Sequence, residues 1–342
     1  MSKYFTNNKL AYWSRSSDYL NGERIIPVTW ELDLTTRCNQ DCPGCTGNRF
    51  FGAQLEPSEA IDYVKQIREL GGQGLILTGG GDPTVNRKAL MAVMGMMPTL
   101  LFTHGELFDE ELANAVLPNL KGIRFSLDAY DAETAHKNRG ITPERWAKTL
   151  DNIRKSVEVK KQLGLNLPIG VAYLTDKERN RGILKFADVA NDLGVDYAQC
   201  RPMLWSTSQQ KQHDWDFQEF QRIYNEASNR YPDLMTCSSQ KYEHIDKGTE
   251  KRCYPKCHTG RFASTIGADS KVYFCCHTRY MESFALGDLK KESLREIFSQ
   301  DRVEQMRDKM SFEVCPILCR GDSINRTVTE MQENKPEHLM FL

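Results

Sequence analysis

The sequence predicts an α/β fold, in which a partial (β/α)6 barrel of parallel strands carries a smaller, cysteine-rich C-terminal domain. From Val28 to Cys200, short β-like runs alternate with longer amphipathic stretches, and parallel neighbouring strands need such crossover helices. After about residue 205 the alternation stops, and loops rich in Cys, Lys and Tyr follow. We therefore expect an N-terminal extension at 1–27, a barrel at 28–205 and a helix plus auxiliary domain at 206–342.

The expected strands are short runs rich in apolar and β-branched residues, at 28–34, 74–78, 100–103, 122–127, 167–174 and 195–200. Apolar residues at helical spacing follow the strands over 58–70 and 146–157, and a third such stripe ends before Gly194, a residue suited to a helix C-terminus. Right-handed crossovers curl such a sheet, and active residues are then expected at the carboxyl ends of the strands.

Composition excludes several classes of protein. The 342 residues include 45 basic and 46 acidic side chains, so the balance gives no sign of a general nucleic-acid surface. The most apolar stretch, from Leu90 to Phe102, is interrupted by Gly95 and Pro98 and is too short for a membrane span. No secretory signal opens the sequence, which favours a cytoplasmic location. In a reducing compartment, eleven cysteines indicate metal ligands or catalytic groups rather than disulfides.

The first cysteine group is a Cx3Cx2C array directly after the first expected strand: Cys38, Cys42 and Cys45. Three thiolates on one short loop can bind three irons of a 4Fe–4S cluster. The fourth iron is then open to the amino and carboxylate groups of an amino acid, here the methionine moiety of S-adenosylmethionine (SAM). A zinc knuckle is the alternative, but structural zinc needs four ligands, and no further Cys or His occurs before His104.

The second expected strand ends in a glycine-rich run, Thr78-Gly-Gly-Gly-Asp-Pro83. Consecutive glycines at a strand end let the backbone approach a ligand closely, and Asp82 can accept a hydrogen bond from an ammonium group. On its own such a run is more often a tight turn. Behind a Cx3Cx2C loop, ligand binding becomes the stronger interpretation.

The Cx3Cx2C array followed by this turn resembles the radical SAM superfamily. In that family a Gly-Gly-Glu motif holds the SAM amino group; Gly80, Gly81 and Asp82 match it, with Asp in place of Glu. The resemblance also implies SAM contacts near the ends of the next strands. The further cofactor-binding residues that it implies are Thr103, His104, Ser126, Asp128 and Arg139.

One position departs from the family pattern. Gly44 stands just before the third cysteine, where many members carry an aromatic residue near the adenine. The adenine is therefore expected to be held elsewhere, by backbone near 170–173.

The C-terminal cysteines form a second group. A hairpin around Arg261–Phe274 delivers Cys275 at its end, and Cys315 and Cys319 form a pair on a tight loop. This layout resembles the twitch or shortened SPASM extension of radical SAM enzymes, which implies a second, auxiliary 4Fe–4S cluster. We expect its ligands to be Cys257, Cys275, Cys315 and Cys319, with Cys276 in place of Cys275, or a structural zinc site, as alternatives.

Two acids, Glu31 and Asp33, share one face of the first strand, which in a partial barrel could be the interior face. Substrate recognition is one interpretation. Pairing with a neighbouring Arg or Lys is the stronger expectation.

The resemblance implies an enzyme that reductively cleaves SAM to methionine and a 5′-deoxyadenosyl radical, with an electron donor such as flavodoxin or ferredoxin. The radical would abstract hydrogen from an unactivated C–H bond. Hydrogen return by a catalytic cysteine, for which Cys253 and Cys276 are the candidates, would give epimerisation. Electron transfer to the auxiliary cluster would instead give dehydrogenation.

The expected substrate is a small polar molecule, such as an aminosugar or a nucleotide-like compound. About 27 residues before the first strand leave no room for the peptide-recognition domain that peptide-modifying members often carry. Radical modification or rearrangement of a peptide or nucleotide is the alternative. A non-catalytic zinc or iron–sulfur binding protein is the alternative from another class.

Overall fold

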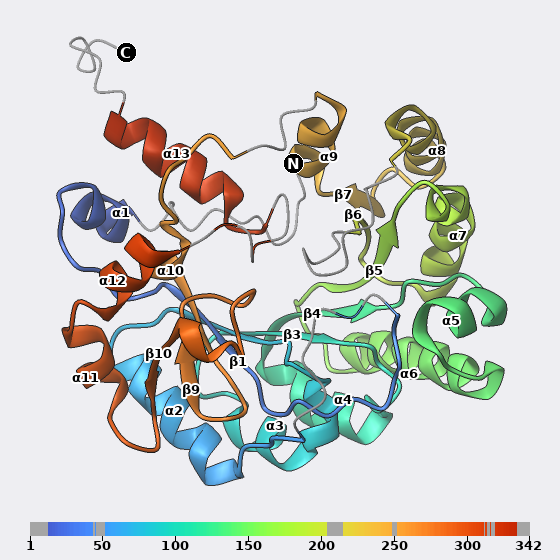
Figure 1. The fold of residues 1–342 in the computed structure, drawn as a ribbon. Helices are drawn as coiled ribbons and strands as arrows, with labels where there is room; N and C mark the ends of the chain where they lie inside the picture. Colours follow the sequence, from blue (N-terminus) through green and yellow to red (C-terminus); the bar gives the residue numbers. More distant parts are fainter. Residues whose placement is uncertain are drawn as a thin grey trace.

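The computed structural model describes residues 13–43, 45, 52–203, 215–247, 252–310, 312, 315 and 319–333. One ten-stranded sheet runs through them, in the order β10-β9-β8-β1-β2-β3-β4-β5-β6-β7 (Figure 1). In this part of the chain the two end strands do not pair with each other, so the sheet remains an open, partial barrel.

All six expected strands are present and parallel to their neighbours. They are β1 (Thr29–Leu32), β2 (Gly74–Leu77), β3 (Thr99–Thr103), β4 (Leu120–Ser126), β5 (Ile169–Thr175) and β6 (Tyr197–Pro202). A short seventh parallel strand that the sequence did not predict, β7 (Met235–Cys237), follows β6. The expected hairpin is β8 (Ala263–Ile266) and β9 (Lys271–Tyr273), and β10 (Ala285–Asp288) extends it with antiparallel pairing.

Helices follow the strands and form an outer arc around the sheet (Figure 1). Several begin at a side-chain cap, as where Asp131 accepts from the Thr134 amide, and α7 ends as expected at Gly194, with φ of 69°. The arc contains α2 (Pro57–Glu69), α3 (Arg87–Val93), α4 (Glu110–Val116), α5 (Ala132–Arg139), α6 (Pro143–Gln162), α7 (Ile183–Leu193) and α8 (Phe217–Arg230).

The remaining helices belong to the two ends of the chain. They are α1 (Trp13–Leu20), α9 (Ser239–Asp246), α10 (Thr259–Phe262), α11 (Leu294–Ser299), α12 (Arg302–Lys309) and α13 (Asp322–Glu333), and short 3-10 turns occupy Pro83–Asn86, Leu117–Asn119, Arg179–Gly182 and Glu282–Phe284. No helix among the described residues is long and apolar enough to cross a membrane.

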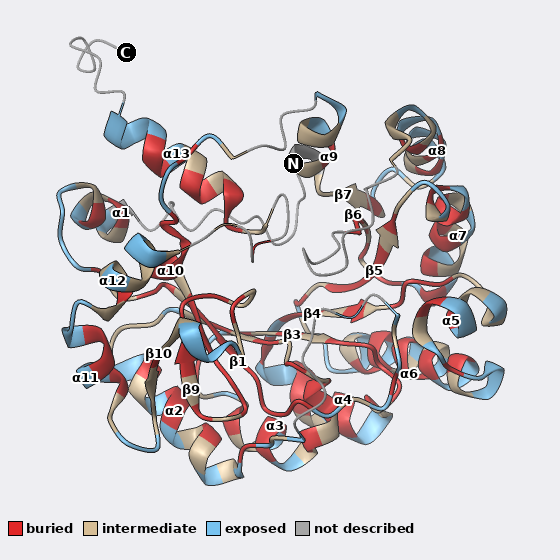
Figure 2. Ribbon diagram, viewed as in Figure 1, coloured by how far each residue is buried: buried red, intermediate tan, exposed pale blue. Residues whose placement is uncertain are grey.

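The main core fills the space between the sheet and the helical arc (Figure 2). On β1, Trp30 and Leu32 point into this core, so Glu31 between them faces the opposite, interior side of the curved sheet. A second apolar cluster joins Tyr19 of α1, Phe262 of α10 and Ile324 of α13.

The chain returns from its C-terminal third to pair with its first strand. β8 lies parallel to β1, with Thr29 opposite Ala263 and Leu32 opposite Ile266. The Asp33 amide continues this ladder by donating to the Ile266 carbonyl at 2.9 Å. The strands of the cysteine-rich part therefore belong to the same sheet as the strands of the barrel. The division of the chain at residues 205–206 stays a prediction.

Candidate functional site

The Cx3Cx2C loop begins directly beyond β1, at the carboxyl edge of the sheet. Cys38 and Cys42 are partly buried and Cys45 is exposed, and the Cys45 amide donates to the Cys42 carbonyl at 3.2 Å. Burial raises the pKa of the Cys38 thiol to about 11, and the neighbouring Cys42 and Cys45 add to this shift. The three sulfur atoms thus lie close enough to influence one another.

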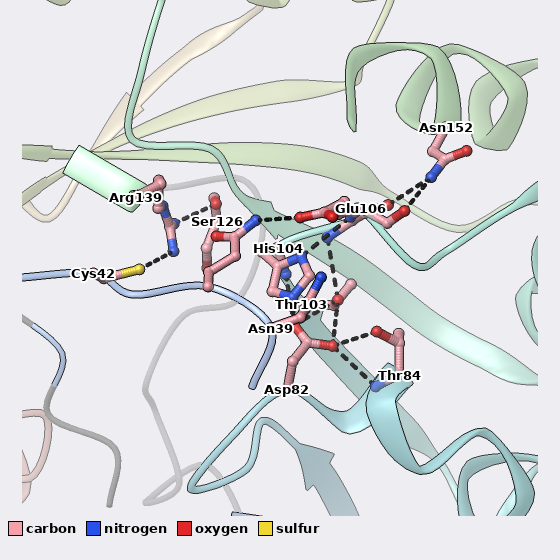
Figure 3. Close-up of polar contacts among 12 residues, drawn as sticks. Asn39, Cys42, Asp82, Thr84, Thr103, His104, Glu106, Ser126, Arg139 and Asn152 are labelled. Carbon is pink, nitrogen blue, oxygen red and sulfur yellow. Dashed lines mark hydrogen bonds and ion pairs between the residues drawn. The ribbon is translucent and has the colours of Figure 1, made fainter. Parts of the chain in front are cut away.

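Arg139, at the end of α5, connects this loop to the end of β4. Its Nη1 donates to Cys42 Sγ at 3.4 Å, and its Nη2 donates to the Ser126 carbonyl (Figure 3). Nη2 also donates to the Asp128 carboxylate. The Asp41 amide donates back to the Arg139 carbonyl at 3.2 Å. Burial alone would lower the pKa of Arg139, but Asp128 and Cys42 raise it, so the guanidinium stays charged.

Asp128 adopts the left-handed backbone conformation, with φ of 49°, and its side chain is satisfied from two directions. Its Oδ1 accepts from the Leu174 amide at 2.8 Å, while Oδ2 accepts from Arg139. Asn138 donates to the Asp128 carbonyl at 2.8 Å. This unusual backbone turn is therefore fixed by three independent contacts.

The Gly79–Asp82 loop packs against the cysteine loop. The Gly81 amide donates to the Thr35 carbonyl and the Asp82 amide to the Arg37 carbonyl, both at 3.0 Å. A Cβ added at Gly81 would lie 1.9 Å from the Arg37 carbonyl oxygen, so only glycine fits there. Close approach between the two loops, and not only approach to a ligand, explains why this position is glycine.

Asp82 is buried, and its carboxylate already has several donors (Figure 3). Thr103 Oγ1 donates to both carboxylate oxygens at 2.9 and 2.8 Å, the His104 amide donates at 2.8 Å, and the Thr84 amide at 2.9 Å. Burial alone would raise the pKa of Asp82, but the His104 ring, the Thr84 hydroxyl and the His104 and Thr84 amides lower it, so the acid is ionised. Asp82 thus joins the ends of β2 and β3, and its contact with SAM stays a prediction.

The His104 ring lies beside Asp82, with Nε2 at 3.4 Å from the carboxylate. Its Nδ1 accepts from the Glu106 amide at 3.1 Å, which places the proton of the neutral ring on Nε2. Burial lowers the pKa of His104, against the opposing effect of Asp82.

A second network, which the sequence did not reveal, supports the cysteine loop from the side of α6. Arg145 binds both carboxylate oxygens of Glu106 at 2.7 Å and donates to the Asn39 carbonyl at 2.6 Å. Gln40 donates to Glu106 at 3.2 Å, and Asn152 holds the Glu106 carbonyl at 2.8 Å (Figure 3). Glu106, Arg145 and Asn152 are far from the cysteine loop in the sequence and belong to no motif.

The C-terminal cysteines also gather. Cys257, Cys275 and Cys315 are buried, and Cys319 is partly buried. Burial raises the pKa of Cys315 to about 11 and that of Cys319 to about 12, and in both cases Cys257 contributes to the shift. Burial, Cys276 and Cys257 raise the pKa of Cys275 in the same direction. The four expected ligands are thus neighbours, although they come from three segments.

The loop that follows Cys276 contacts the Gly79–Asp82 loop and the acids of β1 directly. Arg279 Nη1 donates to Asp33 Oδ1 and to the Gly79 carbonyl, both at 2.9 Å, and its Nη2 donates to Glu31 at 3.2 Å. Tyr280 donates to Asp33 at 2.8 Å, and its ring covers the position where Gly80 would carry a Cβ. The expectation that Glu31 and Asp33 pair with basic residues is confirmed, and Arg279 links the two cysteine sites.

The donor sets fit iron–sulfur clusters in their chemistry, because both groups consist of neighbouring thiols. In the part of the chain that the structure describes, no three Cys, His, Asp or Glu side chains are already arranged to hold a metal ion. Cluster binding would release the protons of the thiols. The choice of individual ligands, including Cys275 over Cys276, stays a prediction.

The candidate catalytic cysteines lie in different surroundings. Cys253 is exposed, and its sulfur accepts from Arg326 of α13 at 3.2 Å. Cys276 lies on the interior side. Burial raises the pKa of its thiol, and the charges of Arg320, Glu31 and Arg279 act on it to a smaller extent. The expected adenine position near 170–173 is partly filled, since a Cβ on Gly170 would lie 2.1 Å from the Tyr197 ring.

Comparisons with known proteins agree with this arrangement. Residues 32–181 match the model of the radical SAM superfamily, and residues 257–320 match SPASM, an iron–sulfur cluster-binding domain. The GTP 3′,8-cyclase of Staphylococcus haemolyticus is 28% identical over 193 residues, which are 49% of this chain and 56% of the cyclase. The chain thus spans about half the length of that relative.

Two further similarities extend over more of the chain. The sporulation killing factor maturation protein SkfB of Bacillus subtilis is 22% identical over 305 residues, which are 83% of this chain and 68% of SkfB. The crystal structure of Streptococcus suis SuiB bound to the precursor peptide SuiA shares the fold, with a TM-score of 0.66 at 13% identity, over 86% of this chain and 70% of SuiB.

The two matched domains agree with the two cysteine groups in both position and order. The first implies a 4Fe–4S cluster with SAM, and the second implies auxiliary 4Fe–4S binding. The chain therefore contains a radical SAM domain over residues 32–181 and a SPASM iron–sulfur cluster-binding domain over residues 257–320.

Proposed function

We propose that the protein reductively cleaves SAM and uses the product radical to abstract hydrogen from an unactivated C–H bond of a polar substrate. The observation that carries this proposal is the connected edge of the sheet. Arg139 binds the cysteine loop, the Ser126 carbonyl and Asp128 at once, while the Gly81 amide fastens the glycine loop to Thr35. Four successive strand ends thereby form one support for a cluster and its ligand.

When bound, the cluster and SAM together supply a 5′-deoxyadenosyl radical and methionine for each electron that enters. The chain's own residues have the task of positioning. Cys38, Cys42 and Cys45 would hold the cluster, and Arg139 would neutralise negative charge beside it. Ser126 and Asp128 would face the ribose, and Gly80–Asp82 with Thr103 and His104 would border the amino acid part.

The test is SAM cleavage by anaerobically reconstituted, dithionite-reduced protein, with 5′-deoxyadenosine measured by mass spectrometry. Wild-type protein should form 5′-deoxyadenosine, and Cys42→Ala should form none because the cluster loses a ligand. Cys237→Ala is the matched control, since this partly buried thiol belongs to neither proposed set. Stoichiometric zinc with little iron, or no 5′-deoxyadenosine from iron-loaded protein, would refute the proposal.

The fate of the substrate radical is either epimerisation or dehydrogenation. For epimerisation, Cys276 is the better hydrogen donor, because it borders the interior charges whereas Cys253 is exposed beside α13. Turnover in deuterated water should then place one deuterium on the product, and Cys276→Ala should abolish that label while Cys253→Ala retains it. An unlabelled product from wild-type protein would favour dehydrogenation, with the auxiliary cluster as electron acceptor.

A peptide is the second candidate substrate. It is favoured by the similarity to SkfB over 83% of the chain and by the shared fold with SuiB, which was solved with a precursor peptide. Similarity to GTP 3′,8-cyclases favours a nucleotide-like molecule instead. The basic side chains on the interior face of the sheet help to decide between a peptide and a nucleotide-like substrate.

A further inference from the structure

Arg124 of β4 and Arg201 of β6 lie on the interior side of the sheet, and Arg320, next to Cys319, pairs there with Glu31 of β1. Lys241 of α9 is a fourth cation, on which Arg201 and Arg320 act as neighbouring charges. Arg124 Nη1 donates to Gln199 Oε1 at 3.1 Å, and Gln199 and Arg201 share one face of β6. Arg201 and Arg320 act on Arg124 and on Lys241 as neighbouring positive charges. Strands and segments that are distant in the sequence thus bring like charges together.

One member of the group, Arg320, pairs with Glu31, which also binds Arg279. The other nearby acids pair with cations outside the group, Asp128 with Arg139 and Asp322 with Arg326 at 2.7 Å. Within the described ranges, neither Arg124, Arg201 nor Lys241 forms an ion pair with a carboxylate. The group therefore has an excess of positive charge.

Burial makes this excess unfavourable for the protein alone. Burial, followed by repulsion from Arg201, lowers the pKa of Lys241 to about 8 and that of Arg124 to about 9. Arg124 Nε has no hydrogen-bond partner among the described residues. Each of the four side chains nevertheless keeps some accessible surface.

The position of the group connects it to the proposed chemistry. Arg124 lies two residues before Ser126, on the same face of β4. Arg320 pairs with Glu31, which also binds Arg279, and Arg279 donates to the Cys276 carbonyl at 2.7 Å. The basic group therefore lies on the interior face, between the strand ends that carry the proposed SAM-binding residues and the C-terminal cysteines. A molecule anchored there would extend toward the reactive edge.

We propose that Arg124, Arg201, Lys241 and Arg320 form a subsite for a phosphate-class oxyanion on the substrate. Guanidinium groups bind two oxygens of a phosphate at once, and several cations match a group that carries more than one negative charge. A single carboxylate would leave most of the excess charge uncompensated. The subsite rests on the proposed function and names its substrate class, a phosphorylated small molecule such as a nucleotide.

The test is calorimetric titration of pyrophosphate into the anaerobically reconstituted full-length protein. Wild-type protein should bind pyrophosphate with an affinity that falls as salt increases. Arg201→Gln and Lys241→Gln should each weaken binding about tenfold or more, because a charge-assisted contact is lost. Arg201→Lys should bind more tightly than Arg201→Gln. Lys241 lies on a helix outside the sheet, so its variant keeps the test informative if Arg201→Gln fails to fold.

The matched control is Arg154→Gln, which removes an exposed arginine from α6 and should leave pyrophosphate binding unchanged. Equal binding by wild-type protein and by both charge variants would overturn the subsite. Tighter binding of a triglutamate peptide than of pyrophosphate would also overturn it, in favour of an acidic peptide. Formation of 5′-deoxyadenosine without pyrophosphate binding refutes the subsite alone, whereas pyrophosphate binding without 5′-deoxyadenosine refutes the proposed function alone.

Discussion

Replacing Arg279 by Gln should destabilise the protein more than the loss of any surface charge. The Arg279 side chain is 12% exposed and contacts Asp33 and Glu31, which are 0% and 4% exposed. It also holds the Gly79 carbonyl at 2.9 Å and the Cys276 carbonyl at 2.7 Å. Glu31 keeps Arg320 as a partner, but Asp33 loses its buried cation and keeps only Tyr280.

Removal of one partner from a buried ion pair costs about 3–5 kcal/mol. For a chain of this size, that corresponds to a melting temperature lower by about 4–7 °C. The loss should depend on pH. Burial raises the pKa of Asp33 and Arg279 opposes the shift, so the variant raises this pKa further. An acid with a raised folded-state pKa destabilises the fold increasingly as pH rises above the unfolded-state value of 3.8, so the gap in melting temperature from wild type should widen as pH rises.

Thermal unfolding of reconstituted protein, followed by tryptophan fluorescence under nitrogen, measures both effects. Arg230→Gln is the control, because Arg230 pairs with Asp188 at the surface and its loss should change the melting temperature little. The double variant Arg279→Gln with Asp33→Asn should recover much of the loss, since no buried charge then lacks a partner. An Arg279→Gln melting temperature equal to that of the Arg230 control, or a gap that narrows as pH rises, would refute the reasoning.

Three further predictions concern the two cysteine sites and their support. Replacing Cys38, Cys42 and Cys45 together by Ala should lower the iron content from about eight to about four atoms per chain, measured by colorimetric iron assay, and an unchanged iron content would contradict the ligand assignment. Gly81→Ala should prevent folding or loading of the first cluster, because its Cβ would lie 1.9 Å from the Arg37 carbonyl, whereas Gly74→Ala meets no atom within 4 Å and should retain iron. Burial lowers the pKa of His104, so the stability it contributes is present above its ordinary pKa of 6.5 and is lost as pH falls below that value. His104→Gln should therefore unfold with a weaker pH dependence between pH 6.5 and 5, and an equal dependence would show that other groups cause it.

Most of the barrel was predictable because its signals are local. Each strand is a short apolar run. The end of α7 could be predicted at Gly194, because glycine readily adopts the left-handed conformation that ends a helix. The motif residues could be assigned to strand ends on the same basis. β7 was missed because its three residues, Met235–Cys237, are too few for a periodic pattern.

The support of the site could not be predicted, because it depends on contacts between distant segments. Nothing around Arg145 indicates that it binds Glu106 and the Asn39 carbonyl. The alternation of Trp30, Glu31 and Leu32 predicted that the acid faces away from the core, but not that Arg279 would reach it from another part of the chain. The sequence shows which face a side chain occupies, and only the assembled sheet shows its partner.

The pairing of β1 with β8 has a consequence for the order of folding during synthesis. One of the two neighbours of β1, the strand Ala263–Ile266, emerges from the ribosome much later than β1 itself. At about 5–20 residues per second, this edge of β1 stays without its partner for about 10–50 s. Unpaired backbone groups on an apolar strand invite pairing with other chains. Slow translation or delayed release should therefore favour aggregation of nascent chains through β1, and synthesis together with a chaperone should improve the yield of folded protein.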